Sequence, residues 1–511
     1  MRTRTLLLPF LFAVAPVLSL AASNAGQFQA SETLLPLAAV VLLTVLVLPL
    51  LTFALRGLQR GAVALALGWF VFFAYGHVAA AIGGAGLTGL AGPSVLLPLF
   101  VLAFLLAVVA IARAPAPPAR LASVLFLVVS VMIGFSAVTL VRFAATQRTP
   151  PAGNLLPEES IVARRVERRP DIYYIIFDRY ASAQTLADRY GFDNGPTLDF
   201  LRSRGFYVAD DSRANYLVTA QSLASSLNIA HVDVLANTVG PNSSDWRPVF
   251  GLLTDHRVAR LLKSLGYRYL HAGPAWNATA ENPYADHNYV YEFLPEFTAI
   301  LLRTTAAYPV LHRMGIGRLD VEKYRRINYQ LELFGGLART EQRPFFLFAH
   351  LLVPHGPFVF NADGSFRDPG TATSHTEPEN YLAQMQFINQ RIQRLVDEIL
   401  SHYPADDPPV IVLQGDEGPY PARTQPHGFD WSQATDEEMN EKMRILNAIY
   451  APGCEDAFYP SQTPVNTFRM LFNCLFDTGL PLLPDRSYAY LDLQHLYDFQ
   501  DVTDRINATS H

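Results

Sequence analysis

Five long apolar stretches without an acidic or basic (Lys or Arg) side chain fill the first 143 positions of the chain. They cover residues 5–22, 34–55, 61–82, 95–112 and 121–141. Each is 18 to 22 residues long, and a helix needs about 20 apolar residues to cross the hydrocarbon of a bilayer. The pattern therefore predicts an N-terminal transmembrane domain, residues 1–143, with five spanning helices.

Arginines mark one side of these stretches. They precede the first stretch and occupy the loops after the second and the fourth: Arg2, Arg4, Arg56, Arg60, Arg113 and Arg120. The other two loops contain no Lys or Arg. The positive-inside rule then places the N-terminus in the cytoplasm and everything after the fifth stretch outside the cytoplasmic membrane. A cleaved signal peptide is an alternative for the first stretch, and its removal leaves this orientation unchanged.

One ionisable side chain, His77, lies within the third stretch. An ionisable group at membrane depth is a functional candidate by default. Because the sequence identifies no partner for it, we interpret His77 as a neutral histidine near the end of a helix.

After residue 143 the pattern changes. Residues 144–170 contain four prolines and the charged run RRVERR, and they predict an extended, solvated linker. From 171 onward, short apolar runs alternate with amphipathic segments. Strands are predicted at 171–177, 267–270, 344–352, 409–413 and 445–451, and helices at 197–205, 219–228, 257–266, 381–403 and 463–479. This alternation predicts one α/β domain, residues 171–511, with a mostly parallel sheet covered on both faces.

The net charge of −6 is the sum of two unlike parts. Residues 1–143 carry seven Arg and one acid, which gives +6, so the remainder carries −12. A chain without a basic excess outside its membrane helices is not a nucleic-acid binder. Only two cysteines occur, Cys454 and Cys474. An oxidising compartment permits a disulfide between them, and two unpaired thiols are equally compatible with the sequence.

Polar side chains follow several of the predicted strands, where parallel sheets bind ligands. Asp178 follows 171–177, His355 follows 344–352, and Asp416 and Glu417 follow 409–413. Gathered carboxylates repel unless a cation bridges them, and a set of oxygen and imidazole ligands suits Mn²⁺, Zn²⁺ or Mg²⁺. Thr219 begins a predicted helix, where a metal-activated hydroxyl would be a nucleophile facing an anion-binding helix end.

Four segments in this order resemble a known family. PDIYYIIFDRY (170–180), YLVTAQSLASSLN (216–228), VPHGPF (353–358) and VLQGDEGP (412–419) are similar to the sulfatase-type branch of the alkaline phosphatase superfamily. Five spans followed by such a domain resemble the lipoteichoic acid synthases and the lipid A phosphoethanolamine transferases. The resemblance implies an extracytoplasmic sulfatase-like α/β sandwich over about residues 165–490.

The resemblance also implies roles for individual residues. Asp178 matches the first acidic metal ligand, and Asp416 matches the acid of the family's Asp-His-Gly metal motif. Thr219 matches the threonine nucleophile, which also contacts the metal, and His355 matches the histidine that binds the substrate phosphate. Arg179, Arg213 and Asn215 are candidates for binding substrate oxygens.

Two positions depart from the family pattern. Glu417 replaces the histidine of the Asp-His pair. Either Glu417 ligates the metal, or His350 or His427 completes the site; both histidines are also candidates for binding substrate. At the nucleophile, Thr219-Ala-Gln-Ser-Leu lacks the Cys, Pro and Arg of the sulfatase motif that yields formylglycine, which argues against sulfate-ester hydrolysis.

The sequence therefore predicts a multi-pass enzyme of the cytoplasmic membrane with a metal-dependent phosphotransferase domain outside. Its donor would be a membrane lipid, its acceptor an envelope glycan or lipid, and its cofactor a divalent Mn, Zn or Mg ion. Two alternatives remain open at this point. One is a phosphate or sulfate ester hydrolase of the same fold, and the other is an inactive membrane scaffold.

Overall fold

The structure is a computed structural model of the chain. It describes residues 2–28, 30–146, 155–157, 159–291, 294–368, 376–424 and 429–507. Contacts divide the chain into two compact units. The first comprises Met1–Arg148 and Phe293–Leu319, and the second comprises Thr149–Glu292 and Asp320–His511.

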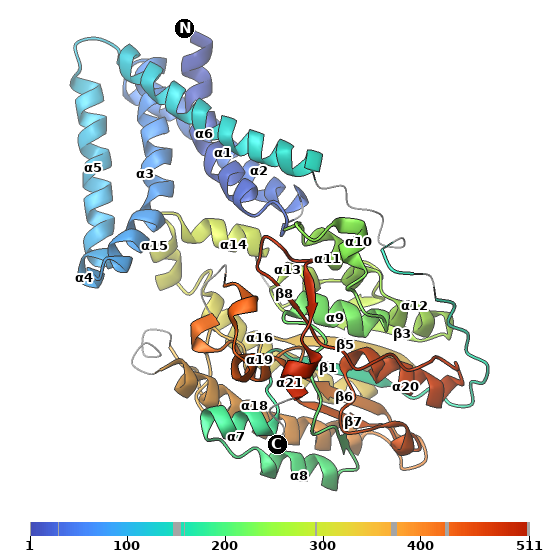
Figure 1. The fold of residues 1–511 in the computed structure, drawn as a ribbon. Helices are drawn as coiled ribbons and strands as arrows, with labels where there is room; N and C mark the ends of the chain where they lie inside the picture. The colour runs from blue at the N-terminus through green and yellow to red at the C-terminus, as the bar shows by residue number, and fades with distance from the viewer. Residues whose placement is uncertain are drawn as a thin grey trace. The chain divides into compact units, whose positions relative to one another are not determined.

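Among its described residues, the first unit contains five helices long and apolar enough to span a membrane, as predicted. They are α1 (Arg2–Ser23), α2 (Leu34–Ala54), α3 (Leu58–Gly84), α5 (Pro93–Arg113) and α6 (Ala119–Thr146), with the short η1 (Ala30–Thr33) and α4 (Thr88–Ala91) between them. Helix α1 packs against α2, α3 and α6 (Figure 1). The surface of the unit is apolar, as expected for helices that contact lipid, because α2, α5 and α6 expose rows of Leu, Val and Phe side chains.

A segment distant in sequence belongs to the same unit. Helices α14 (Glu296–Arg303) and α15 (Tyr308–Arg313) follow the membrane helices by 150 residues. Phe297 is fully buried in the apolar core of the unit. The Gly76 N–H donates to the Thr304 carbonyl over 2.9 Å, and the Ala306 N–H donates to the Phe72 carbonyl over 2.8 Å. The sequence patterns did not predict this association.

The second unit is built on a seven-stranded sheet in the order β2-β7-β6-β1-β5-β3-β4. The strands are β1 (Ile172–Phe177), β2 (Tyr207–Val208), β3 (Arg268–Ala272), β4 (His287–Asn288), β5 (Phe345–Leu351), β6 (Val410–Gln414) and β7 (Asn447–Tyr450). The five strands from β6 to β4 run parallel, and β7 is antiparallel to both β6 and β2. A separate hairpin-like pair joins β8 (Tyr488–Tyr490) to β9 (Phe499–Asp501). The mostly parallel sheet is as predicted.

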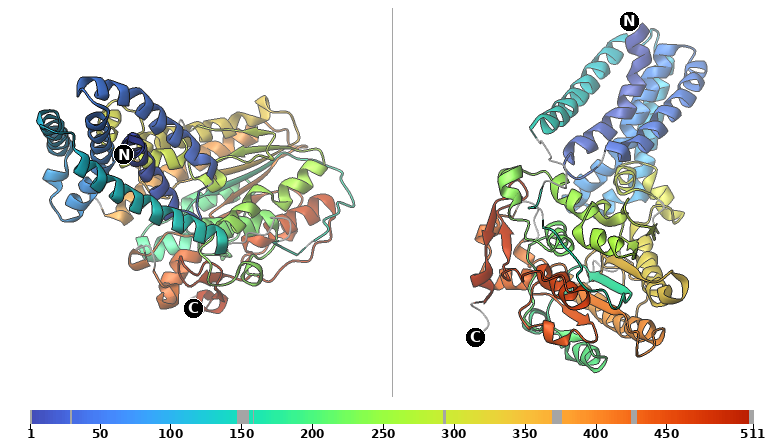
Figure 2. Two further views of the ribbon diagram at one scale, coloured as in Figure 1. Left: turned by 90° about the horizontal axis from the view of Figure 1, so that it is seen from above. Right: turned by 90° about the vertical axis from the view of Figure 1, so that its right-hand side faces the viewer.

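Helices cover both faces of this sheet, as Figures 1 and 2 show. The bounds of the α-helices in this unit are α7 (Ala183–Tyr190), α8 (Gly195–Ser203), α9 (Thr219–Asn228), α10 (Leu235–Val239), α11 (Arg247–Thr254), α12 (Arg257–Ser264), α13 (Asn277–Ala280), α16 (Leu319–Thr340), α18 (Glu377–Ser401), α19 (Asp436–Met443), α20 (Pro464–Phe476) and α21 (Thr503–Asn507). Short 3₁₀ turns lie at η3 (Ala422–Thr424), η4 (Trp431–Gln433) and η5 (Glu455–Ala457).

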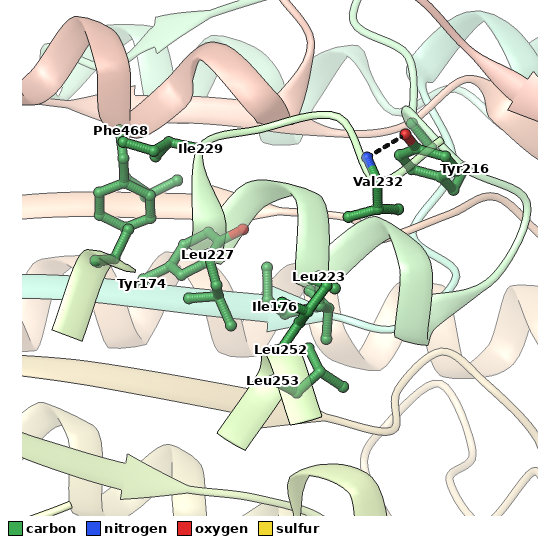
Figure 3. Packing of buried hydrophobic residues seen from close by; sticks show 14 of the residues in the cluster. Tyr174, Ile176, Tyr216, Leu223, Leu227, Ile229, Val232, Leu252, Leu253 and Phe468 are labelled. Atoms are coloured by element: carbon green, nitrogen blue, oxygen red, sulfur yellow. Dashed lines mark hydrogen bonds between the residues drawn. The ribbon is translucent and has the colours of Figure 1, made fainter. Parts of the chain in front are cut away.

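The central strand β1 divides the core into two layers. Its side chains alternate, so Tyr174 and Ile176 pack with α9, α11, α12 and α20, whereas Tyr173, Ile175 and Phe177 pack with α8, α16 and α18. Figure 3 shows the first layer, in which Leu223 and Leu227 of α9 pack near Ile176 and Tyr174. In the same layer the Val232 N–H donates to the Tyr216 hydroxyl over 2.7 Å. This packing fixes α9, and with it Thr219, against the middle of the sheet.

Cys454 and Cys474 form a disulfide between the turn after β7 and helix α20. The sequence had left this pairing open.

Candidate active site

The register of three neighbouring strands brings the predicted acids together. β1 lies between β5 and β6, and Ile176 pairs with both His350 and Gln414. Asp178 therefore leaves the sheet two residues beyond Ile176, and Asp416 leaves it two residues beyond Gln414. Because the carboxyl ends of parallel strands share one edge of a sheet, both acids reach the same place as His350 of β5.

Asp178, His350 and Asp416 form a buried group with metal-ligand geometry. One ligand atom from each lies within 4.8 Å of the others. The Asp178 Oδ2 lies 3.4 Å from His350 Nε2, and all three side chains are almost wholly buried. His350 therefore lies with the two acids. It is one of the two histidines that the sequence offered as an alternative to Glu417.

The polar atoms of this group fit a divalent cation. Asp178 Oδ1 and Asp416 Oδ2 are buried and have no hydrogen-bond partner among the described residues, which is costly for carboxylate oxygens away from water. The remaining Asp416 oxygen, Oδ1, accepts from the backbone N–H groups of Glu417 (2.8 Å) and Arg179 (3.1 Å). Two acids and an imidazole match the ligands of Zn²⁺, Mn²⁺ and Mg²⁺ sites.

The pKa values of Asp178 and Asp416 also favour a bound cation. Burial raises the pKa of Asp416 to about 6, and the charge of Asp178 adds to the effect. Burial also acts on Asp178, but the facing imidazoles of His355 and His350 outweigh it and hold the pKa of Asp178 below its usual range. The pKa of one carboxyl is raised and the pKa of its neighbour is lowered, as expected for two like charges that share a site. A cation would relieve this repulsion.

A second layer of contacts orients the group. His350 Nδ1 shares a hydrogen bond of 2.9 Å with the Thr279 hydroxyl, which leaves Nε2 toward Asp178. The Ser222 hydroxyl in α9 donates to the Asp416 carbonyl over 2.7 Å. Such contacts fix the rotamers of ligand side chains and raise metal affinity.

Thr219 is the first residue of α9, as predicted. The N-cap is Val218, so the Thr219 hydroxyl is not used as the side-chain cap of this helix. It lies close enough to Asp416 that the hydroxyl lowers the pKa of that carboxyl, against the larger effect of burial. The hydroxyl therefore lies beside the three grouped residues at a helix N-terminus, where an anion is favoured.

Glu417 has a different partner. Its Oε1 accepts from Lys442 Nζ over 2.6 Å, and both side chains are buried. Lys442 Nζ also donates to the Gly418 carbonyl and lies 3.5 Å from the centre of the Tyr420 ring. Burial raises the pKa of Glu417, while Lys442 opposes that effect. Where the family pattern has a histidine, this chain has a buried carboxyl–ammonium pair.

His355 lies on a loop that is fixed by hydrogen bonds to its backbone carbonyl groups. Its N–H donates to the Asp178 carbonyl over 3.1 Å. Lys323 Nζ of α16 donates to the carbonyls of His355 and Pro357, and Gln384 of α18 donates to the carbonyls of Pro354 and His355. Burial and the charge of Arg179 lower the pKa of His355 to about 3, so its imidazole is neutral at physiological pH.

A cavity of about 210 Å³ opens beside these groups. Arg179, His355, Tyr381, Tyr420 and Glu441 are among the residues that line it. The Arg179 guanidinium stacks on the Tyr420 ring at 4.5 Å, and its Nε lies 3.8 Å from Glu417 Oε1. A substrate phosphate in this cavity would meet the arginine and the histidine together.

Two other predicted substrate residues lie elsewhere in the fold. Asn215 is fully buried and uses its amide on Thr463, Val465 and the Arg486 carbonyl, which ties it to the start of α20. Arg213 is buried near Arg444 and is not among the residues that line the cavity. The other histidine alternative, His427, falls outside the described residues.

Lys323, Gln384 and Lys442 are site residues that the sequence patterns did not single out. They come from helices α16, α18 and α19, and a helical pattern alone does not tell which group a buried polar side chain faces. The only signal was a lysine or glutamine at a position of the apolar face, since lysine is almost never fully buried unless paired.

Comparisons with known proteins identify the family of this chain. Residues 170–445 match the family model described as Sulfatase. No curated protein sequence matches the chain. Among solved structures, the zinc complex of the C-terminal periplasmic domain of EptC from Escherichia coli is 13% identical with a TM-score of 0.41, and the match covers 62% of this chain and 87% of that one.

Two further structures show the same level of similarity. The periplasmic domain of the phosphoethanolamine transferase EptC from Campylobacter jejuni is 10% identical, with a TM-score of 0.39, over 63% of this chain and 99% of that one. A putative sulfatase from Bacteroides thetaiotaomicron is 14% identical, with a TM-score of 0.35, over 65% and 75%. The family model, which matches more than half of the chain, identifies the protein as a member of the sulfatase family of enzymes.

Proposed function

We propose that this protein is a membrane-bound phosphotransferase that uses Thr219 as its nucleophile and a divalent metal ion held by Asp178, His350 and Asp416. The observation that carries the proposal is the convergence of two unpaired carboxylate oxygens and an imidazole beside a threonine hydroxyl at a helix start. When bound, the ion would supply Lewis-acid chemistry that favours the ionised hydroxyl and neutralises phosphate charge.

The side chains account for two half-reactions. In the first, the Thr219 oxygen forms a bond to phosphorus while the ester bond to the lipid alcohol breaks, and the proton of Thr219 ends on that alcohol. In the second, an acceptor hydroxyl takes the phosphoryl group and returns a proton to Thr219. Arg179 and the neutral imidazole of His355 face the same cavity and would hold the phosphate oxygens.

The nucleophile favours phosphate over sulfate esters. Thr219-Ala-Gln-Ser-Leu contains no cysteine or serine at the reacting position for conversion to formylglycine. A threonine that forms a phosphoester is the simplest chemistry for this position, and a hard metal site suits it.

The layout of the chain supports a lipid donor. Five helices can hold the enzyme in a bilayer. The placement of the arginines supports a cytoplasmic membrane with the catalytic domain outside. That domain would comprise residues 171–511 apart from 293–319, which belong to the first unit, and the segment predicted as a linker, 144–170, would join it to the membrane helices. A phospholipid head group as donor and an envelope glycan or lipid as acceptor are both within reach of such an enzyme.

The test is turnover of phospholipid by the full-length protein in vesicles. With phosphatidylethanolamine or phosphatidylglycerol vesicles, the wild type should release diacylglycerol, whereas Thr219→Ala should release none and keep its bound metal. Thr238→Ala, a threonine of α10 outside the site, is the matched control and should retain activity. Full activity of Thr219→Ala would overturn the mechanism. Release of free phosphate ester without any transfer to an added sugar or lipid acceptor would replace transferase with hydrolase.

A further inference from the structure

The first unit contains a cavity that the proposed reaction does not use. Its volume is about 410 Å³, within the range of about 300–1,000 Å³ typical of small-molecule sites. Side chains from α1, α3 and α6 line it, and Leu301 and Thr304 at the end of α14 close one side. All of these residues belong to the first unit.

The cavity is polar at one end and apolar at the other. Helices α1 and α3 run in the same direction, because the chain returns through α2 between them. Phe12 comes early in α1 and Ser23 ends it, so a helix rise of 1.5 Å per residue separates them by about 16 Å. Phe70 and His77 of α3 are separated by about 10 Å in the same sense. The aromatic side chains therefore lie deeper in the membrane than Ser23 and His77.

The His77 imidazole lines this cavity and needs a polar partner there. Its side chain is exposed. The acids of this unit are Glu32 and Glu296, and neither is among the described residues that line the cavity. A polar ionisable group exposed at membrane depth is costly without a polar partner. A phosphate at the membrane surface supplies one, because the imidazole can donate a hydrogen bond to it.

The wall formed by α14 is fixed in place by backbone contacts. The Gly76 N–H bonds to the Thr304 carbonyl, and the Ala306 N–H bonds to the Phe72 carbonyl. A Cβ on Gly76 would lie 2.6 Å from the Arg303 carbonyl oxygen, so only glycine permits this approach. The Thr304 carbonyl therefore has a hydrogen-bond partner within the protein, as a backbone group at membrane depth requires.

We propose that this cavity binds one glycerophospholipid from the outer leaflet of the membrane. An acyl chain lies among Phe12, Phe70 and Met132, and the head-group phosphate lies at His77 beside Ser23 and Thr304. A lipid is the occupant because the cavity lies among spanning helices, where lipid is the surrounding medium, and because its polarity matches a lipid with head outward and tail inward. The site goes beyond the proposed reaction, since binding here needs membrane insertion but no catalysis.

Photo-crosslinking of the full-length protein tests this site. The probe is a phosphatidylethanolamine with a diazirine on one acyl chain, diluted into phosphatidylcholine vesicles, and the labelled peptides are mapped by mass spectrometry. Labelling should concentrate on the cavity faces of α1, α3 and α6. Ala74→Trp, which fills the cavity from α3, should lower that labelling about tenfold, as expected for a loss of about 1.4 kcal/mol of binding free energy. Leu106→Trp on the exposed face of α5 is the matched control and should change nothing.

Two further variants separate the alternatives. Ser19→Trp fills the same cavity from α1 and should repeat the effect of Ala74→Trp, which guards against misfolding of one variant. Thr219→Ala should bind the probe normally, so failure of the lipid site and failure of the catalytic proposal are distinguishable. Equal labelling of α5 and of the cavity helices, or cavity labelling that survives both tryptophan variants, would overturn the proposal.

Discussion

The two facing carboxylates of the site make a quantitative prediction about the metal-free protein. Replacing Asp416 by Asn removes a charge but keeps the acceptor Oδ1, which receives the backbone N–H groups of Arg179 and Glu417. The new amide nitrogen takes the place of Oδ2, for which the described part of the chain offers no hydrogen-bond partner, and can donate to Asp178. Asp416→Asn should therefore stabilise the metal-free protein while abolishing tight metal binding.

The magnitude follows from the pKa of Asp416. Burial first, and then the charge of Asp178, raise that pKa from 3.8 to about 6. One pKa unit is worth about 1.4 kcal/mol, so ionised Asp416 costs the folded state about 3 kcal/mol. For an acid whose folded pKa is raised, this cost is complete above pH 6 and disappears below pH 4, where the carboxyl is protonated in both states.

The assay is thermal unfolding of the full-length protein in detergent after metal removal with EDTA. At pH 7.5, Asp416→Asn should raise the unfolding temperature by about 6 °C, since a large domain shifts by about 2 °C per kcal/mol. At pH 4 the difference should vanish. Added Zn²⁺ or Mn²⁺ should stabilise the wild type and leave the variant unchanged. Asp188→Asn, an exposed acid on α7, is the control and should show no shift at either pH. Destabilisation of the metal-free protein by Asp416→Asn at pH 7.5, or a difference independent of pH, would refute the reasoning.

Three other predictions concern the same unit. Lys442→Met leaves Glu417 buried without its ammonium partner and should lower the free energy of unfolding by about 3 kcal/mol. The double variant with Glu417→Gln should recover most of that loss. Chemical denaturation measures the stability of both variants. Thr435→Ala removes the capping box of α19 and should cost about 1 kcal/mol in the same measurement. Metal affinity of the wild type, followed by titration calorimetry, should fall about tenfold for each pH unit below 6, because protonated Asp416 must release its proton to bind the ion. An affinity that is constant from pH 7 to pH 5 would contradict the assignment of Asp416 as a ligand.

The sequence patterns predicted the spans and the sheet because both depend on local composition. Uncharged runs of about 20 residues have few structural solutions, and DIYYIIF has the length and β-branched character of a buried strand. Asp178 and Asp416 were predicted to meet for a topological reason. Each directly follows a predicted parallel strand, and such strand ends share one edge of the sheet.

Contacts between distant segments were beyond the sequence patterns. His350 lies inside the apolar run of β5, which indicates a buried position but does not show its partner Asp178. Lys442 gives no sign in sequence that it pairs with Glu417, 25 positions away. The docking of α14 on α3 depends on Gly76, whose need for close approach appears only once Thr304 lies beside it. Register and long-range packing decide these contacts, and local propensity does not encode them.

In the proposed reaction, Thr219 carries the transferred group. The most direct measurement is the mass spectrum of the peptide containing Thr219 after acid quenching of the metal-loaded, full-length enzyme during turnover of phosphatidylethanolamine vesicles. We expect a phospho-alcohol adduct on Thr219 in the wild type and its disappearance when Asp416→Asn removes a metal ligand. An unmodified Thr219 peptide accompanied by product formation, or an adduct on another side chain, would contradict it.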